Sequence, residues 1–174
     1  NDIMLLQLME YTMDNIPILT KRRLQAEVVG PLYQEMVDQV GQHKAEQILE
    51  SAIQKAAIDE GRQFAAQSAS SDQSPMRRFI DLFEQWTTGG ALEVDTLLES
   101  DERFEFNVTR CRYAEMYQKM GLGHIGRLLS CNRDGTFCHG FDDRITLKRD
   151  QTIMDGAPCC TFRYAYDPQS ELES

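Results

Sequence analysis

The sequence is 174 residues long, which suits one domain, and we expect residues 1–174 to fold as a single unit. Hydrophobic residues make up 41% of the chain and charged residues 26%, as is typical of a soluble globular protein. The longest apolar runs span three or four residues, whereas a membrane-spanning helix needs about 20. The pattern therefore excludes a membrane-spanning helix.

The charge balance narrows the range of partners. Lys and Arg number 18 and Asp and Glu number 28, so the net charge is −10. Such a field repels phosphate backbones and anionic lipid surfaces, and we expect neither nucleic acid nor membrane as a partner. The densest basic cluster, Lys21–Arg23, is interpreted as the solvated side of a helix. A small-molecule substrate is the expected partner, and apolar stripes on the helices are compatible with a homo-oligomer.

The cysteine content bears on the cellular compartment. Five cysteines, an odd number, occur in a sequence whose first residues lack the basic and apolar regions of a secretory signal. We therefore expect a cytoplasmic protein with free thiols and no structural disulfide. The absence of an initiator methionine suggests that the sequence is part of a longer chain.

Residues 1–88 are expected to form a helical half, with helices over 3–15, 17–30, 31–41 and 43–64. Pro17 suits the first turn of the second helix and Gly30 its end. In the fourth helix, apolar residues recur at three- and four-residue steps, which indicates one buried stripe. The stripe consists of Ile48, Leu49, Ala52, Ile53, Ala56, Ala57 and Phe64.

A further short helix is predicted after the serine-rich loop 68–74. Ser74 is a natural N-cap, Pro75 fits the first helical position, and Gly89-Gly90 ends the helix. The apolar stripe of this helix ends with Trp86, which is the single tryptophan of the sequence. We interpret it as a core anchor.

In residues 91–166 the spacing of apolar residues changes from three- and four-residue steps to alternation. This part is predicted to form an α+β half, and an acidic tail, 167–174, follows it. Alternation of apolar and polar residues predicts strands over 92–98, 104–109, 145–148 and 160–166. Ser100–Glu102 supplies a hairpin turn, and a short helix from Tyr113 should stop at Gly121. The predicted class is α+β, with a helical N-terminal half packed against a C-terminal antiparallel sheet.

Residues with reactive side chains gather in this second half. They are Cys111, Cys131, Cys138, Cys159, Cys160, His124 and His139. No pair has the Cys-x-x-Cys spacing of a structural zinc site, and we expect no metal and no cofactor. Strand phase also separates the adjacent pair, because Cys160 shares the core face with Phe162 and Tyr164 whereas Cys159 lies on the other face.

The spacing Cys131-x-x-Asp134 places a carboxylate three residues from a thiol. If the segment is helical, both side chains share a face and can address one ligand. Asp134-Gly135 is also typical of a simple turn. Spacing alone does not decide between the two structures.

Several unusual positions between Phe104 and Tyr166 form a longer pattern. They are Phe106–Tyr113, Gly121-Leu122, Cys131-x-x-Asp134, Arg149-x-x-Thr152, Gly156 and Cys160-x-Phe162-Arg163-Tyr164. In order and spacing, this pattern resembles the L-2-amino-thiazoline-4-carboxylic acid hydrolase family. The resemblance implies a hydrolase of cysteine metabolism. Such an enzyme opens a cyclic isothiourea by adding water at the carbon between sulfur and nitrogen, which gives a carbamoyl-cysteine.

The resemblance also implies which groups do the chemistry. Cys131 is the expected nucleophile, because a thiolate can attack the amidine carbon when a cationic neighbour lowers its pKa. Asp134 should bind the amidine N–H groups, and His139 is a candidate proton donor. Cys111 and Cys160 are further candidates for the nucleophile. We expect Cys111, Cys131, Asp134 and Cys160 to converge around one pocket.

The substrate carboxylate calls for an arginine fork. Arg149 is the first candidate because it matches the family pattern together with Thr152, which should assist nearby. Arg163 and Arg112 are the other candidates.

Two alternatives to a hydrolase remain open. In the first, the chain is a non-catalytic ligand-sensing module, or one in which Cys111, Cys131 and Cys160 bind a soft metal ion. In the second, the chemistry is related to that of organomercurial lyases, whose sites also combine a Cys-x-x-Asp-like pair with a distant cysteine.

Overall fold

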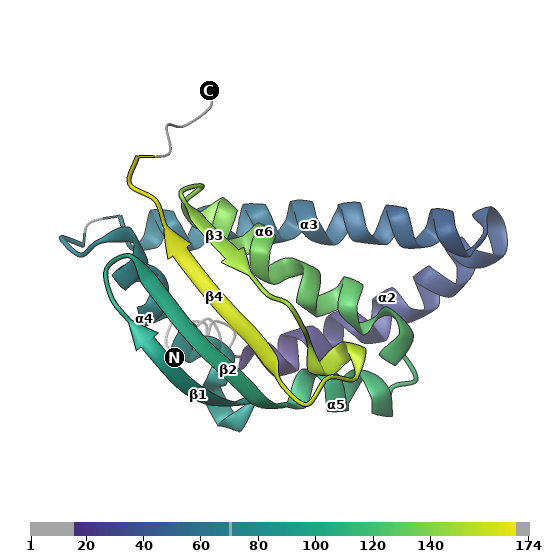
Figure 1. The fold of residues 1–174 in the computed structure, drawn as a ribbon. Coiled ribbons are helices and arrows are strands. Elements are labelled where there is room, and N and C mark those ends of the chain that lie inside the picture. Colours follow the sequence, from purple (N-terminus) through teal and green to yellow (C-terminus); the bar gives the residue numbers. More distant parts are fainter. Residues whose placement is uncertain (1–15, 70, 170–174) are drawn as a thin grey trace, which may run out of the picture.

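The structure is a computed structural model that describes residues 16–69 and 71–169. Its helices are α2 (Ile18–Val40), α3 (Gln42–Gln67), α4 (Pro75–Thr87), α5 (Arg112–Lys119) and α6 (Asn132–Phe141). Its strands are β1 (Leu92–Glu99), β2 (Arg103–Cys111), β3 (Ile145–Lys148) and β4 (Cys160–Tyr166). The helices pack behind one antiparallel sheet of order β1-β2-β4-β3 (Figure 1). The predicted α+β class is confirmed, whereas the helix predicted over 3–15 lies outside the described residues.

Helix α2 continues through Gly30 and Pro31, so the end predicted at Gly30 is wrong. Proline removes one backbone hydrogen bond inside a helix, but tertiary packing is close at this point: a Cβ on Gly30 would lie 3.2 Å from the side chain of Leu122. The helix instead ends at Gly41, whose φ of 81° suits glycine. The two short helices predicted here are one long helix.

Helix α3 confirms the predicted amphipathic helix, although its buried stripe is narrower than predicted. Ile48 is exposed, and the buried positions are Ala45, Leu49, Ala57 and Gly61. Small residues occupy this stripe because α3 and α6 run side by side in close contact (Figure 1). A Cβ on Gly61 would lie 2.4 Å from the carbonyl oxygen of Phe137.

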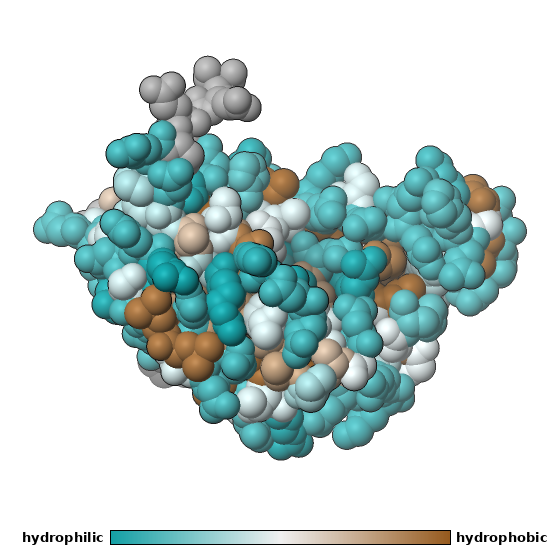
Figure 2. Space-filling model, viewed as in Figure 1, coloured by the Kyte–Doolittle hydropathy of each residue, from teal (hydrophilic) through white to brown (hydrophobic). Residues whose placement is uncertain are grey.

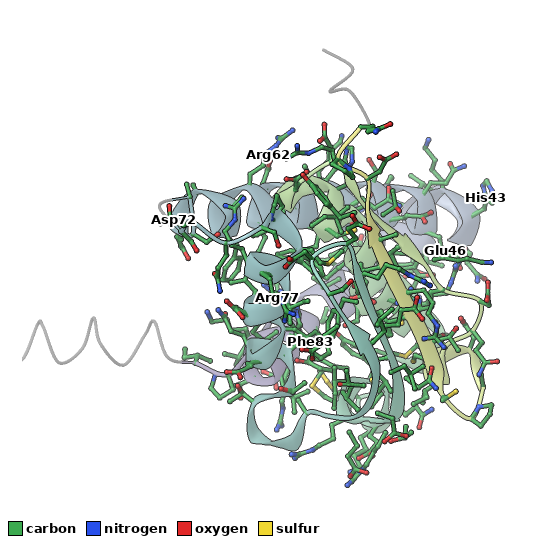
Figure 3. All side chains as sticks on the ribbon, turned by 60° about the vertical axis from the view of Figure 1, so that its left-hand side comes forward. His43, Glu46, Arg62, Asp72, Arg77 and Phe83 are labelled. Carbon is green, nitrogen blue, oxygen red and sulfur yellow. The ribbon has the colours of Figure 1, made fainter. Side chains whose placement is uncertain are left out.

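The capping prediction for α4 is confirmed. The Ser74 hydroxyl accepts a hydrogen bond from the backbone N–H of Arg77 at 3.3 Å, and Pro75 is the first helical residue. Phe83 reaches from this helix toward the strands (Figure 3), and its ring lies 4.5 Å from that of Phe106. Trp86 packs edge-on against Phe137, with 5.1 Å between ring centroids.

The predicted hairpin is also confirmed, with the backbone N–H of Ser100 donating to the carbonyl of Arg103 across the turn. The inward residues of β2 and β4 pair across the strands, among them Phe106 with Phe162. The opposite face of the sheet is mostly hydrophilic (Figure 2). On the edge strand β1, Leu97 and Leu98 remain exposed.

Two apolar clusters make up the core. The first lies between the sheet and helices α4 and α6, and the second joins α2, α3 and α5. Trp86, Leu92 and Cys111 pack against both clusters. No described helix combines the length and the apolarity that crossing a bilayer requires.

Candidate functional site

A cavity of about 90 Å³ lies where the two clusters meet. Its wall includes Trp86, Leu92 and Cys111, the residues that contact both clusters. Aromatic rings from α4, α6 and β4 supply much of the remaining apolar wall, including those of Phe83, Phe137 and Phe162. The cavity has room for a ligand about the size of one ring, and its apolar walls are typical of small-molecule sites.

Three thiols and one carboxylate of the predicted site reach this cavity. Cys111, Cys131, Asp134 and Cys160 all contribute to its lining, so the structure brings together the residues that we expected to converge. They come from separate elements: Cys111 ends β2, Cys131 and Asp134 lie at the start of α6, and Cys160 begins β4. All five cysteines of the chain are free thiols.

The segment around Cys131 is helical, which answers the question that the spacing left open. A π-helical turn, η3 (Arg127–Cys131), leads directly into α6. Such turns occur frequently at functional sites. One helical turn then separates Cys131 from Asp134. Gly135 is tolerated because it lies on the open side of the helix, where a Cβ would meet nothing within 4 Å.

The cavity thiols are protonated rather than preformed thiolates. Burial raises the pKa of Cys131, and the negative charge of Asp134 raises it further, although Arg149 acts in the opposite direction. Burial also raises the pKa of Cys111, to about 11, and that of Cys160. The lowered pKa that a preformed thiolate requires is therefore not found, and a proton acceptor must assist any thiol attack.

Asp134 and Arg149 form an ion pair in the cavity wall. Arg149 also donates through Nη2 to the carbonyl of Cys131 at 2.9 Å, and its guanidinium lies 5.0 Å from the centre of the Phe162 ring. These contacts join α6 to the segment after β3. They also fix the planar guanidinium in one orientation.

The ion pair lies in a desolvated environment. Burial raises the pKa of Asp134 more strongly than Arg149 lowers it. The Asp134 side chain, of which 30% of the surface is accessible, contributes to the lining of the cavity. Burial lowers the pKa of Arg149, but the attraction of Asp134 outweighs it, and the guanidinium stays charged.

A second ionic group in the cavity wall was missed by the sequence analysis. Glu60 of α3 accepts hydrogen bonds from Arg22 of α2 and Arg133 of α6, and Nη2 of Arg22 lies 2.9 Å from Oε2 of Glu60. Burial raises the pKa of Glu60, but the two guanidinium groups outweigh it and the net shift is downward. The prediction that Lys21–Arg23 is solvated is wrong for Arg22, which is only 5% exposed.

Helical spacing carried a signal that could have revealed Arg22. The residues four positions before and after it, Ile18 and Ala26, are both buried on α2. A charged residue in phase with an apolar stripe must find a buried partner. Glu60 supplies that partner from a different helix, 38 positions away, and no local pattern connects the two.

Four other predicted site residues do not line the cavity. Thr152 caps a short 3₁₀ turn, where its hydroxyl donates to Asp155 and accepts from the Asp155 backbone N–H. Arg163 binds the carbonyls of Phe106 and Phe162. The remaining two are Arg112, which is exposed and donates to the Gly89 carbonyl, and His139, which is exposed beside a separate surface hollow.

The structure offers no prepared metal centre within residues 16–69 and 71–169. No group of three or more His, Cys, Asp or Glu side chains is arranged there to hold a metal ion. Cys111, Cys131 and Cys160 share the cavity wall without forming a thiolate cage.

Comparisons with known proteins place the chain among others of similar sequence or fold. A family model described as L-2-amino-thiazoline-4-carboxylic acid hydrolase matches residues 21–164. A search of curated proteins returns no significant match.

Two solved structures illustrate the likeness in fold. One is the phenol-responsive sensory domain of the transcription activator PoxR, crystallised with phenol. It is 16% identical with a TM-score of 0.53, covering 83% of this chain and 75% of that one. The other is a trafficking protein particle complex subunit 3 from Naegleria fowleri covalently bound to palmitic acid. It is 12% identical with a TM-score of 0.47, covering 85% of this chain and 96% of that one. At 16% identity, the likeness to the sensory domain concerns the fold alone.

Proposed function

Since the chain belongs to the L-2-amino-thiazoline-4-carboxylic acid hydrolase family, we propose that it hydrolyses a small cyclic amidine such as 2-aminothiazoline-4-carboxylate in this cavity. The observation that carries the proposal is the convergence of Cys131, Asp134 and two further thiols on one cavity of about single-ring size. A thiol beside a carboxylate provides both a nucleophile and a proton acceptor. The substrate offers the matching groups, an electrophilic carbon and N–H donors.

The first step is attack by the Cys131 sulfur on the amidine carbon. Because burial raises the pKa of this thiol, Asp134 takes its proton as the new S–C bond forms, and the C=N π electrons of the amidinium move onto its nitrogen. Asp134 suits this role because its own pKa is raised, mainly by burial. A carboxyl group with a raised pKa is a stronger base than one in water.

The ring then opens. The nitrogen lone pair re-forms the C=N bond as the bond between the amidine carbon and the ring sulfur breaks, and the ring sulfur takes the proton held by Asp134 and leaves as a thiol. Water next attacks the carbon bound to Cys131, the C=N π electrons return to nitrogen, and the water transfers a proton to Asp134. Finally the Cys131 sulfur leaves with that proton while the new hydroxyl group forms the C=O bond and releases its proton to solvent, so the thiol is restored and a carbamoyl group remains on the product.

Other residues of the cavity support these steps. Arg149 holds the carboxylate of Asp134 in place through its ion pair and its bond to the Cys131 carbonyl. The aromatic walls limit competing water and strengthen electrostatic contacts. The proton transfers need no contribution from His139, which does not line this cavity.

Turnover of 2-aminothiazoline-4-carboxylate tests the proposal. Release of a new thiol, measured with a chromogenic disulfide, should be clear for the wild type and fall by several orders of magnitude in Cys131→Ser. Cys159→Ser is the matched control, because Cys159 lies outside the cavity and binds Gln151. Unchanged turnover in Cys131→Ser would move the nucleophile to Cys111, Cys160 or water. Absence of turnover by the wild type would count against the hydrolase.

A second candidate function is ligand sensing without turnover. The mainly aromatic and apolar wall and the protonated thiols support it, as does the fold shared with the phenol-responsive sensory domain of PoxR. Binding of small ring compounds with no release of product would favour sensing. Covalent labelling of Cys131 by the thiazoline would favour hydrolysis.

A further inference from the structure

The charges in the cavity wall do not balance. Among the described residues of the lining, three are arginines and two are carboxylates. Asp134 and Arg149 compensate each other one to one. The excess therefore lies at the other group, where Arg22 and Arg133 share the single carboxylate of Glu60. A buried charge without a counter-charge is costly, so this group favours the arrival of an anion.

Arg133 has hydrogen-bond donors that could bind such an anion. Among the described residues it donates a hydrogen bond only through Nη2, to Glu60. Its Nε and Nη1 have no hydrogen-bond partner among the described residues. Neither is fully buried, so both nitrogens have accessible surface. The side chain as a whole is only 10% exposed and lines the cavity. The accessible donors therefore face the space that a ligand would fill.

The other two arginines are occupied. Arg22 donates from one terminal nitrogen to Gln25 and from the other to Glu60. Arg149, the arginine first expected to bind the substrate carboxylate, is held by Asp134 and by the carbonyl of Cys131. Burial and the like charge of Arg22 lower the pKa of Arg133, although Glu60 opposes the shift. The positive charge at Arg133 is thus under-compensated.

We propose that Arg133, with the positive charge of Arg22 beside it, is the subsite for the carboxylate of an anionic single-ring ligand. This inference rests on the proposed use of the cavity as the ligand site. Because Arg133, Asp134 and Cys131 line one cavity, a ring whose carboxylate binds Arg133 can also contact the other two side chains. Cationic ring compounds without an acid group are disfavoured by the same excess charge.

Binding of a matched pair of probes tests the subsite without requiring turnover. Benzoate and benzamide have the same ring and nearly the same shape, but only benzoate is charged. Isothermal titration of the whole chain should show benzoate bound about tenfold to a hundredfold more tightly, as expected for one charge-assisted contact. Arg133→Gln should bring this ratio close to one. Arg133→Lys keeps the charge but loses the two-pronged guanidinium, so it should retain part of the preference for benzoate. If Arg133→Gln fails to fold, the Lys variant tests the subsite by itself.

The matched control is Arg23→Gln, because Arg23 is exposed on α2 and, within the described part of the chain, pairs only with Glu27. Its preference for benzoate should equal that of the wild type. Equal binding of the two probes by the wild type, no binding of benzoate at millimolar concentration, or an unchanged ratio in both Arg133 variants would overturn the subsite. Preference for benzoate without turnover of the thiazoline would leave the subsite standing and count against the hydrolase alone. Turnover of the thiazoline without a preference for benzoate would support the hydrolase and overturn the subsite.

Discussion

The carboxylates of the two ionic groups in the cavity have pKa values shifted in opposite directions. Asp134 meets one guanidinium, and burial raises its pKa, whereas Glu60 meets two, and their charges lower its pKa despite burial. The balance between burial and the surrounding guanidinium charges therefore decides the direction of each shift. Asp134 is therefore able to exchange a proton near the thiols, whereas Glu60 stays ionised.

In the proposed function, this difference separates chemistry from binding within one small cavity. The pair Asp134–Arg149 lies beside the thiol of Cys131 and suits proton transfer. The group Arg22–Glu60–Arg133 ties three helices together and presents spare positive charge. Changes to the first group should therefore alter turnover most, and changes to the second should alter stability and ligand charge preference.

Among changes to the two ionic groups, the largest effect is expected from Asp134→Asn. The variant keeps the size of the side chain but removes the proton acceptor, so turnover of 2-aminothiazoline-4-carboxylate should fall by about a hundredfold to ten-thousandfold, the usual contribution of a general base. Because the deprotonated form is active and burial raises the pKa of Asp134, wild-type activity should fall with decreasing pH at values above the ordinary aspartate pKa of 3.8. A pH–rate profile of both proteins measures this.

The control for this change is Asp143→Asn, which alters a carboxylate beside the separate surface hollow. Its turnover and acid limb should match those of the wild type. If Asp134→Asn kept the acid limb of the wild type, that limb would belong to another group, and the role of base would pass from Asp134.

Glu60→Gln should cause the next largest effect, a loss of stability. Two buried guanidinium groups would lose their counter-charge, which should lower the free energy of unfolding by about 2 to 3 kcal/mol at neutral pH, a value reduced for partial solvent access. The folded pKa of Glu60 lies below its ordinary value of 4.5. Its contribution is therefore full above that value and disappears as the pH falls through the lowered pKa.

Urea denaturation at several pH values measures the difference between wild type and Glu60→Gln. The gap should be constant near neutrality and close at acidic pH. Glu46→Gln serves as the comparison, because among the described residues its carboxylate accepts hydrogen bonds from Tyr33 and Gln42 and from no guanidinium. A gap that persists unchanged into strong acid would mean that packing, and not charge, makes Glu60 important.

Sequence pattern singled out the residues of one of these two groups, although not their ion pair, and missed the other group, for a physical reason. Cys131, Asp134 and Arg149 lie within one region of the chain, and the family pattern connects them. Strands 145–148 and 160–166 were also predicted to the residue, because alternation reports directly which side of a strand is buried. These features are local, and local periodicity is what a single sequence contains.

The missed features depend on contacts between distant segments. Helix α2 passes through Pro31 because of packing that a helix-ending signal does not encode. The helical state of Asp134-Gly135 depends on α6 lying against α3, whereas the dipeptide alone equally suits a turn. Arg22 and Glu60 meet only after two helices have packed.

A smaller effect is expected at the crossing of α3 and α6, which sets the distance between Glu60 and Arg133. In Gly61→Ala the new Cβ would meet the Phe137 carbonyl at 2.4 Å, so the helices must separate. The free energy of unfolding should fall by about 1 to 2 kcal/mol, and the preference for benzoate should fall with it.

Gly135→Ala is the control, because its Cβ meets nothing within 4 Å. That variant should be as stable as the wild type or slightly more so. Equal stability of both variants would contradict close packing at the crossing.

The smallest effect is expected from Arg149→Lys, which preserves the charge beside Asp134. A lysine ammonium is a point charge on a flexible stem and cannot bind Asp134 and the Cys131 carbonyl in the fixed plane of a guanidinium. If Arg149 only orients Asp134, kcat should fall by about threefold to tenfold, while the ratio of benzoate to benzamide affinity stays at the wild-type value. If Arg149 instead binds the ligand carboxylate, KM should rise and the affinity ratio should drop. Steady-state kinetics together with the probe titration therefore distinguish the two arginines: a drop in the ratio for Arg149→Lys with none for Arg133→Lys would assign the carboxylate to Arg149.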